Sequence, residues 1–535
     1  MKKALAAIAL LALAVRIGLL LRGVASVDRL FVPDDTYYTL AIARSLAQGL
    51  GPTADGVTLT SGFQPLIAFL LVPVFWFTRS LDVPVYAACA IGSVADTLST
   101  WLIGSLAARI GGWRAGVASA LLWSLSSIAI ANALNGLETA LAVFLELALV
   151  ASWLSARKRA TPRAFVVSGV LAGFALLSRI DAIFLVGILF LFELARRRLR
   201  ETAISAGAAL AVVAPWWLYC VIHFGSPIPA SGDAVHHLVA LHREQYLTVP
   251  WALGWAAGSV LTSPFFEAPG LSELASSDAV FGVGLWAVAL LAGLLFTRRF
   301  FARKTSWLSP YVAFAAFGAT LFAFYSLYLP ALWFFRRYFA PVHAFAALAV
   351  GVLFALCARK AKASFGARSM LGLLVAAAFL LLTKTGLFLI LKPTATIDAG
   401  LHGAKGYRAA ARDVLALTPR SAILGALQSG ALSYYANGCP SVVGLDGVVD
   451  PNAARAVRER TLSDYAARRG VTHFADWPYN RSTFAQLSER SKWKPAALEP
   501  LGSARPQGSD QFDVARIIWP AELPQPRAQA NRCSP

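Results

Sequence analysis

The chain has 535 residues, of which 57% are hydrophobic and only 14% are charged, and its mean hydropathy is +0.61. Soluble proteins carry about 25% charged residues, so this composition excludes an ordinary soluble globular protein. The formal net charge of +20 does not indicate a nucleic-acid partner, because Lys and Arg collect in the cytoplasmic loops of membrane proteins. Long apolar runs recur along the chain, so we expect a polytopic α-helical membrane protein.

The first apolar run covers residues 4–22 and follows the basic pair Lys2 and Lys3. It is similar to a signal peptide, but its cleavage site is indistinct, so we interpret it as a retained helix. Because Lys and Arg concentrate on the cytoplasmic side of a membrane, we expect a cytoplasmic N-terminus. The next segment, 23–82, is then an outer loop.

Residues 64–77 form an apolar stretch inside this outer loop. The stretch contains Pro65 and Pro73 and is shorter than the roughly 20 residues that a spanning helix needs. Basic clusters lie at 157–159, 196–200, 298–304 and 359–368. All of them fall on the cytoplasmic side only if this stretch does not cross, so we expect it to stay in the outer leaflet. About eleven crossings then remain, namely 4–22, 83–107, 115–133, 139–155, 164–178, 182–195, 202–222, 279–297, 308–328, 339–357 and 369–391.

The hydropathy falls sharply after Lys392, which predicts a transmembrane domain at 1–391 and a soluble outer domain at 392–535. In the outer part, helical periodicity alternates with short apolar runs that are typical of buried strands, which indicates a small α/β domain. The two cysteines in this part, Cys439 and Cys533, are the only ones placed to pair outside the cell. The expected helices are 407–417 and 453–469, the expected strands are 422–427, 441–445 and 471–475, and the end after about 518 is expected to be disordered.

Polar residues gather at the expected outer ends of the helices and in the outer loops. They are Asp34, Asp35, Glu138, Arg179, Asp181, His236, His237, Arg336, Arg337 and Tyr338. Charged groups at a bilayer edge are costly unless they are paired or used, so their convergence on one side indicates a functional site. Each of these residues also has a simpler explanation. Arg336 and Arg337 could bind the phosphate groups of membrane lipids. Arg179 and Asp181 suit a local salt bridge, and the two histidines suit a solvated loop.

Asp34 and Asp35 are the hardest of these residues to explain structurally. Adjacent like charges raise each other's pKa and stabilise nothing unless a cation, a helix N-terminus or a substrate hydroxyl group offsets them. The residues from Thr36 onward have a helical pattern, so the pair also lies at a helix N-terminus, where negative charge is favoured. The pair is therefore the leading candidate for a functional role.

Several short motifs resemble one family in their order and sidedness. The motifs are 34–38 (DDTYY), 60–66 (TSGFQPL), 135–139 (NGLET), 178–181 (SRID), 337–341 (RYFAP), 428–432 (QSGAL) and 444–449 (GLDGVV). Together they resemble the GT-C superfamily of membrane glycosyltransferases, which use polyprenyl-phosphate sugars. That superfamily includes protein O-mannosyltransferases, galacturonic acid transferases and arabinofuranosyltransferases. No single motif is specific, but the resemblance spans most of the chain and implies a GT-C fold.

The resemblance implies an inverting transfer of a sugar from a polyprenyl-phosphate donor to an acceptor hydroxyl group at the outer face of the cytoplasmic membrane. The acceptor is then a glycan, a lipid or a protein of the cell envelope. The family places the general base at the first acid of the pair, so Asp34 is the first choice, and Asp35 is expected to orient it or to bind the sugar. The leaving phosphate needs positive charge, which Arg179 and either Arg336 or Arg337 are suited to supply.

The remaining residues are expected to bind substrate. They are Glu138, Asp181, Tyr37, Tyr38, Tyr338, His236 and His237. Glu138 is expected to hold the acceptor or a cation, and the two histidines stand where relatives often have a Lys. A divalent cation, Mg or Mn, is a further option, with Asp34, Asp35 and Glu138 as oxygen ligands.

Two other functions fit the same residues. A transporter or flippase of lipid-linked sugars would bind the phosphate with the same arginines but would need no general base. A membrane scaffold whose outer domain docks a partner would tolerate neutralisation of both Asp34 and Glu138. The sequence does not define the sugar, the acceptor or the length of the polyprenyl chain.

Overall fold

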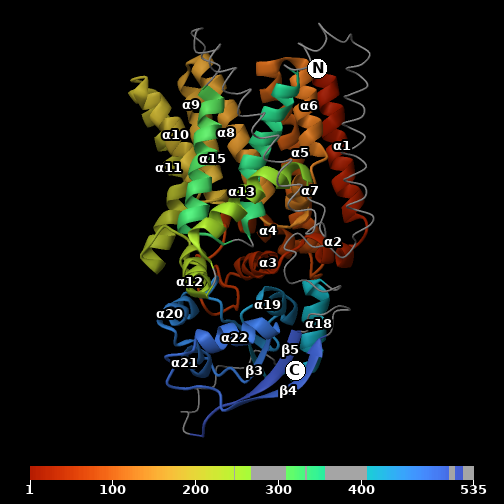
Figure 1. The fold of residues 1–535 in the computed structure, drawn as a ribbon, viewed down its shortest axis with the longest axis vertical. Helices are drawn as coiled ribbons and strands as arrows, with labels where there is room; N and C mark the ends of the chain where they lie inside the picture. The colour runs from red at the N-terminus through yellow and green to blue at the C-terminus, as the bar shows by residue number, and fades with distance from the viewer. Residues whose placement is uncertain (246, 267–308, 332–333, 356–405, 505–511, 522–535) are drawn as a thin grey trace.

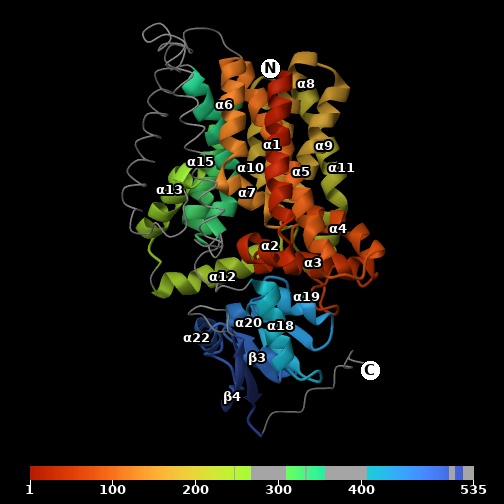
Figure 2. The ribbon, with the colours of Figure 1, turned by 90° about the vertical axis from the view of Figure 1, so that its right-hand side faces the viewer.

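The computed structural model of the chain is elongated, with a helix bundle at one end and an α/β layer at the other (Figure 1). It describes residues 1–245, 247–266, 309–331, 334–355, 406–504 and 512–521. The N-terminus lies at the end of the bundle that is remote from the α/β layer (Figures 1 and 2). Two of the crossings expected from the sequence, 279–297 and 369–391, lie outside the described residues.

Five of the described helical runs are long and apolar enough to cross a membrane. They are α1 (Lys2–Leu20), α5 (Val83–Gly111), α8 (Thr139–Arg159), α11 (Leu199–Phe224) and the run Tyr311–Tyr328, which joins α15 (Ser309–Ala323) to the π-helical turn η2 (Phe324–Tyr328). A sixth span is formed if α6 (Trp113–Ser124) and α7 (Ser127–Leu134) act together, although these two helices meet at 57°. The helix expected over 115–133 is therefore broken, because the backbone at Ser126 is extended.

Four shorter apolar helices complete the described part of the bundle. They are α4 (Pro65–Phe77), α9 (Pro162–Ser178), α10 (Ala182–Ala195) and the helix Ala340–Ala355. The 13 residues of α4 make a helix about 20 Å long, against a hydrocarbon core of about 30 Å. In both views α4 lies beside α3 (Asp34–Ala47) at the end of the bundle that faces the α/β layer (Figures 1 and 2). This helix is shorter than the hydrocarbon core, and its place in the outer leaflet stays a prediction.

Small residues allow the helices of the bundle to approach closely. A Cβ atom added at Gly169 of α9 would lie 2.2 Å from the main-chain oxygen of Ser205 in α11. The Ser205 hydroxyl group donates to the Phe165 carbonyl oxygen at 3.0 Å across the same interface. A Cβ atom at Gly92 of α5 would similarly lie 2.3 Å from the Ala133 carbonyl oxygen in α7. Glycine and serine are the usual residues at such contacts, because association within a membrane depends on close packing.

The α/β layer contains a five-stranded sheet in the order β2–β1–β3–β5–β4. The strands are β1 (Ile423–Ala426), β2 (Ser441–Gly444), β3 (His473–Asp476), β4 (Ala497–Ala504) and β5 (Phe512–Ile518). Strand β1 pairs in parallel with β2 and β3, whereas β5 is antiparallel to β3 and β4. The helices of the layer are α18 (Tyr407–Leu417), α19 (Gly430–Ala436), α20 (Pro451–Glu459), α21 (Leu462–Arg468) and α22 (Pro478–Gln486).

The three strands expected from the sequence correspond to β1, β2 and β3. Strands β4 and β5 were not expected, and β4 carries a register shift between Pro500 and Gly502 that interrupts its alternation. The helix expected over 453–469 is divided into α20 and α21, because Arg460 adopts a left-handed backbone conformation with φ of 57°. Regular structure extends to Ile518 at the end of β5.

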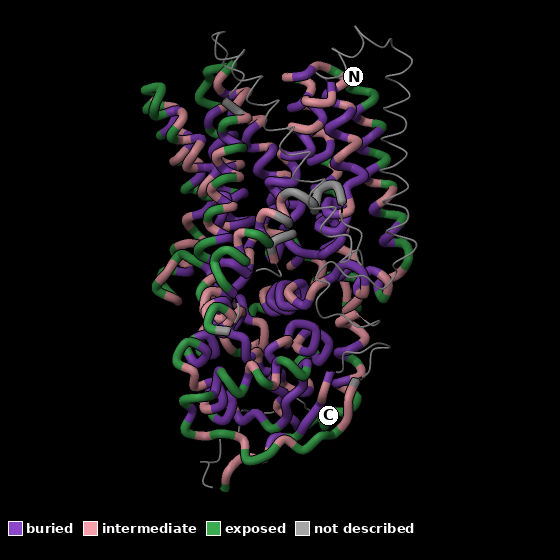
Figure 3. The backbone as a smooth tube through the Cα atoms, viewed as in Figure 1, coloured by how far each residue is buried: buried purple, intermediate pink, exposed green. Residues whose placement is uncertain are grey.

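Several short helices lie between the bundle and the layer. They are α2 (Val24–Phe31), α3 and α12 (Ala230–Gln245), whereas α13 (Val249–Phe266) lies against the bundle and contacts α7, η2 and α16 (Phe335–Tyr338). Helix α3 packs on α19, α2 packs on α18, and α12 packs on α20. Buried residues therefore continue from the bundle through α3 into the layer, as Figure 3 shows, and one hydrophobic cluster includes residues of both parts.

The contact between α9 and α11 predicts opposite effects for two glycine substitutions. Gly169→Ala places a methyl group against a main-chain carbonyl and should lower the free energy of unfolding by about 1–3 kcal/mol. Gly207→Ala in α11 meets no atom within 4 Å and should be neutral or stabilising by up to about 1 kcal/mol, because Ala favours a helix. Thermal unfolding in detergent micelles measures the difference, and equal midpoints for the two variants would contradict this packing.

Candidate active site

The site begins at the first turn of α3, which follows Pro33 directly. Asp34 and Asp35 occupy this turn, where the free N–H groups of the helix favour negative charge. Successive side chains of a helix point about 100° apart, so the two carboxylates have different surroundings. Asp35 points toward α16, and Asp34 points toward the α/β layer.

Asp35 forms an ion pair with Arg337. The Nη2 atom of Arg337 donates to Asp35 Oδ2 at 2.8 Å; the side chain of Asp35 is 29% exposed and that of Arg337 is 16% exposed. The guanidinium group of Arg337 also lies 4.4 Å above the ring of Phe334 and 5.9 Å from that of Tyr338. This pair is only partly buried, so both charged groups are accessible to a substrate.

Arg179 is the most heavily paired cation of the site. It follows α9 directly, is 4% exposed, and donates from Nη1 to Glu138 Oε1 at 3.0 Å. Its Nε and Nη2 atoms form a fork on Asp181, with distances of 3.1 and 2.7 Å. The hydroxyl group of Tyr325 lies 3.1 Å from the same Nη2 atom and donates to Asp181 Oδ2 at 2.6 Å. The local salt bridge between Arg179 and Asp181 is therefore present, and it extends to Glu138.

Tyr338 joins these two ion-pair groups. Its ring stacks on that of Tyr325 with centroids 4.3 Å apart, and the Arg179 guanidinium group lies 5.2 Å from its centre. Tyr338 is adjacent to Arg337 in α16. Residues that are 302 positions apart in the sequence, Asp35 and Arg337, thus belong to one continuous site with Glu138 and Asp181.

Asp34 is not part of this accessible group. It is 3% exposed, and its two oxygen atoms accept the backbone N–H groups of Gly430 and Ala431, both at 2.8 Å. Burial raises the pKa of Asp34 to about 7, although these two hydrogen bonds act in the opposite direction. Asp35 is therefore the more exposed carboxylate of the acidic pair, whereas the family resemblance favours Asp34 as the base, and that choice stays a prediction.

Tyr37 and Tyr38 are buried side chains of α3. The Tyr37 hydroxyl group donates to Asp28 Oδ1 at 2.5 Å, and its ring packs against Tyr434 and Tyr435 of α19. The Tyr38 hydroxyl group lies 3.1 Å from Asp446 Oδ2. Each side chain is buried against other parts of the protein, and the expected role of both tyrosines in substrate binding stays a prediction.

The remaining candidates lie at the edge of the site. His236 stacks on Tyr328 of η2 with centroids 4.9 Å apart, and His237 Nδ1 lies 2.8 Å from the Asp233 carbonyl oxygen within α12. In the described ranges, no hydrogen bond joins either histidine to the ion pairs around Asp35 and Arg179. Arg336 lies in α16, and its side chain is outside the described residues.

The carboxylates proposed as ligands of a divalent cation do not converge. Within the part of the chain that the structure describes, no group of three or more His, Cys, Asp or Glu side chains could hold a metal ion. Asp34 accepts main-chain N–H groups, whereas Asp35 and Glu138 each pair with an arginine. These three residues therefore do not fit a common metal site in this arrangement.

Two residues of the site were missed by the sequence analysis. Tyr325 ends an apolar run and shows no polar motif, and only the π-helical turn η2 brings its hydroxyl group onto Asp181. Glu146 lies two turns along α8 from Glu138 and is 2% exposed, with neither carboxylate oxygen hydrogen-bonded within the described residues. A lone acid within an apolar helix is a sequence signal of function that was available for Glu146.

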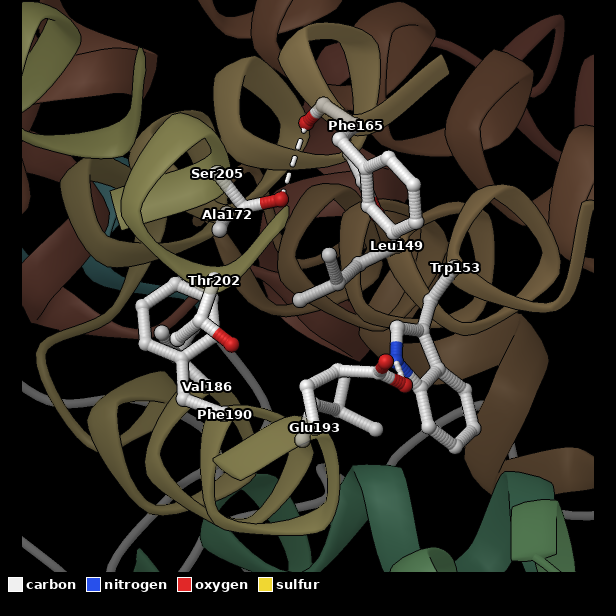
Figure 4. Close-up of a pocket in the computed structure, with 11 residues that line it drawn as sticks. Leu149, Trp153, Phe165, Ala172, Val186, Phe190, Glu193, Thr202 and Ser205 are labelled. Atoms are coloured by element: carbon white, nitrogen blue, oxygen red, sulfur yellow. Dashed lines mark hydrogen bonds between the residues drawn. The ribbon is translucent and has the colours of Figure 1, made fainter. Parts of the chain in front are cut away.

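A small pocket among α8, α9, α10 and α11 lies away from this site, at the basic ends of those helices (Figure 4). Glu193 accepts the indole N–H of Trp153 at 2.9 Å there and pairs with Arg157 at 3.3 Å. Two of the described basic clusters, 157–159 and 196–200, thus meet at Glu193, at the end of the bundle opposite the site.

The shared ion pair of Arg179 predicts a strong coupling in stability. Arg179→Met leaves Glu138 and Asp181 buried without a cation and should lower the free energy of unfolding by about 3–5 kcal/mol. Adding Asp181→Asn should recover about 0.5–3 kcal/mol, because it removes one unpaired charge. Thermal unfolding measures both values, with Arg163→Met at an exposed position as the control. Additive losses in the double variant would contradict the shared pair.

Comparison with known proteins gives a family match and a fold. Residues 65–219 match the family described as dolichyl-phosphate-mannose-protein mannosyltransferase. The matched segment includes Glu138, Arg179 and Asp181. No curated protein sequence matches the chain.

The fold is similar to that of two membrane glycosyltransferases. ArnT from Cupriavidus metallidurans, solved bound to undecaprenyl phosphate, has a TM-score of 0.54 at 15% identity over 97% of this chain and 99% of its own. The archaeal oligosaccharyltransferase AglB from Archaeoglobus fulgidus, in complex with an inhibitory peptide and a dolichol-phosphate, has a TM-score of 0.54 at 16% identity over 95% of this chain and 74% of its own. The Archaeoglobus fulgidus oligosaccharyltransferase in complex with Zn and sulfate gives a TM-score of 0.56 at 15% identity, over 94% of this chain and 72% of its own. The partial family match and the shared fold agree with the resemblance expected from the motifs, and the chain has a fold similar to that of ArnT and AglB.

Proposed function

We propose that this protein is an inverting glycosyltransferase that moves a sugar from a polyprenyl-phosphate donor to an acceptor hydroxyl group at the outer face of the cytoplasmic membrane. The observation that carries the proposal is the ion pair of Asp35 and Arg337, which places a carboxylate and a phosphate-binding cation together at an accessible site. The ArnT and AglB structures, which contain undecaprenyl phosphate and dolichol-phosphate, support a lipid-phosphate donor. The acceptor is proposed to be a glycan, lipid or protein of the cell envelope.

The proposed orientation puts the N-terminus in the cytoplasm and the α/β layer outside. Lys2 and Lys3 begin α1 at the end of the bundle remote from the layer, and the Arg157 cluster lies at that same end. Basic residues favour the cytoplasmic side. Cys439 of the layer is disulfide-bonded, and such bonds persist in oxidising compartments. We propose a transmembrane catalytic domain at 1–391 and an outer domain at 392–535.

Asp35 is proposed as the general base. A base must reach the proton of the acceptor hydroxyl group within about 3 Å, and Asp35 is the more accessible carboxylate of the acidic pair. Asp34 is enclosed by Gly430 and Ala431, so a role in holding α3 suits it better. Glu138 and Asp181 are proposed to orient the acceptor and the sugar. Their carboxylate oxygens would do so while both residues stay paired with Arg179.

Arg337 is proposed to bind the donor phosphate. The three acids Asp35, Glu138 and Asp181 face the two guanidinium groups of Arg179 and Arg337. Arg179 already binds Glu138, Asp181 and Tyr325, whereas Arg337 is more exposed and binds Asp35. A phosphate has the charge and the geometry to compete with a carboxylate for a guanidinium group. Donor binding would therefore draw Arg337 away from Asp35 and leave that carboxylate free to accept a proton.

The transfer then follows from these positions. The acceptor oxygen attacks the anomeric carbon from the face opposite the phosphate, which inverts the configuration. The bond between the anomeric carbon and the phosphate oxygen breaks, and its electron pair stays on the phosphate. The hydroxyl proton passes to Asp35, and Arg337 stabilises the charge that develops on the leaving phosphate.

Neutralising each acid of the pair separately tests this assignment. Asp35→Asn removes the base and should lower kcat for transfer from a polyprenyl-phosphate sugar by about 10²–10⁴-fold. Asp34→Asn should lower kcat by only about 10-fold, because it disturbs the position of α3. Purified protein in detergent with a radiolabelled donor measures both rates.

Two outcomes would contradict the assignment. A larger loss in Asp34→Asn than in Asp35→Asn would return the base to Asp34. Undiminished activity in both variants, together with loss of donor binding in Arg337→Ala, would favour a lipid-linked-sugar transporter over a transferase.

A further inference from the structure

The α/β layer presents the ends of its parallel strands to α3. Strands β1, β2 and β3 run in parallel, so their carboxyl ends meet at one edge of the sheet. In open α/β sheets, ligands bind in the crevice outside the carboxyl ends of the strands, where the strand order reverses. Here β1 lies between β2 and β3, and α3 packs on α19 and contacts the loops that follow β1 and β2.

Asp34 occupies the position after β1 that a ligand would take. Its carboxylate accepts the N–H groups of Gly430 and Ala431 at the start of α19. The Tyr38 hydroxyl group, one turn further along α3, lies 3.0 Å from Ser429 Oγ and 3.1 Å from Asp446 Oδ2 after β2. Residues of the first outer loop thus contact the loops that follow both strands.

The receiving loop is itself held from the neighbouring strand. Asp476 at the end of β3 is fully buried and accepts the N–H groups of Leu427 and Gln428 at 2.6 and 3.1 Å. The amide of Asn480 donates to the same carboxylate at 2.5 Å. The loop after β1 is therefore fixed on one side by Asp476 and on the other side by Asp34.

The fit between the loop and α3 requires glycine at position 430. A Cβ atom there would lie 2.3 Å from the main-chain oxygen of Asp34 and 2.9 Å from its Oδ2 atom. The main-chain atom cannot move without moving the first turn of α3. Asp35 is the next residue of that turn, so its position depends on this contact.

We infer that the α/β layer positions the reacting carboxylate, Asp35. Asp34 fills the crevice at the carboxyl ends of the strands, in the place where a separate ligand would otherwise bind. The attachment of Asp34 to Gly430 and Ala431 sets Asp35 opposite Arg337. Gly430, Ala431 and Asp476 are then positioning residues that touch no substrate. The inference rests on the proposed function for its effect on turnover, but the attachment itself is independent of that function.

A matched pair of glycine substitutions separates positioning from stability. Gly430→Ala presses on Asp34, whereas Gly425→Ala in β1 places a methyl group 2.8 Å from Val471 Cγ1, within the layer and away from α3. Gly430→Ala should lower kcat by about 10-fold or more, because small misplacements of reacting groups cost about 10²-fold. The KM for the donor should stay within about two-fold. Gly425→Ala should lower the melting temperature of the protein but leave kcat within about two-fold.

Hydrogen exchange supplies a readout that does not depend on turnover. The amides of Tyr38 and Thr39 bond to the carbonyl groups of Asp34 and Asp35 in the helical pattern of α3. Their exchange should be faster in Gly430→Ala and unchanged in Gly425→Ala. Equal exchange or equal kcat in the two variants would overturn the inference.

A replacement variant and a donor-binding measurement cover the cases in which the first comparison fails. If Gly430→Ala does not fold, Asp34→Asn replaces it, since its amide retains only one oxygen acceptor for the two N–H groups and should give the same pattern. If the wild-type protein binds polyprenyl phosphate but transfers no sugar, the proposed function fails. In that case the exchange comparison still decides whether the layer holds α3.

Discussion

The site depends on the sharing of one guanidinium group between two buried acids. Arg179 binds Glu138 at 3.0 Å and Asp181 at 2.7 Å, in a place where all three side chains are almost inaccessible to water. Burying a charge without a partner is among the most costly events in folding, so each of these groups stabilises the others. Because Glu138 precedes α8, Arg179 follows α9 and Asp181 precedes α10, the interaction also fixes the ends of three helices at one level of the bundle. Asp35 and Arg337 lie beside that fixed level, and Tyr338 makes the connection.

The second constraint is that α3 contacts both the helix bundle and the α/β layer. One face of its first turn presents Asp35 to the bundle, and the other attaches Asp34 and Tyr38 to the strand ends of the α/β layer. A pair of adjacent acids is costly when both have the same surroundings. Here one acid is bound by main-chain N–H groups and the other by an arginine, so the repulsion between them is offset from two directions. The acidic pair is thus explained by two separate tasks.

The sequence predicted much of this arrangement, and the reasons for its failures are local. The convergence of Asp35, Glu138, Arg179 and Arg337 was expected, since helix sidedness alone brings the ends of crossing segments together. The different surroundings of Asp34 and Asp35 could not be expected, because they depend on a contact with Gly430, 396 residues away. Tyr37 and Tyr38 were assigned to substrate for the same reason, although the ring of Tyr37 packs on α19 and the hydroxyl group of Tyr38 lies beside Ser429 and Asp446 of the α/β layer. Tyr325 depends on a single π-helical turn, and no periodic pattern marks such a turn.

The most direct test of the account is an experimental structure of the protein with bound polyprenyl phosphate. We expect a phosphate oxygen within about 3 Å of the Arg337 guanidinium group, with the contact between Arg337 and Asp35 opened and Asp34 still bound to Gly430 and Ala431. A phosphate bound at the opposite, basic end of the bundle, or bound while Arg337 keeps its contact with Asp35, would contradict the central claim.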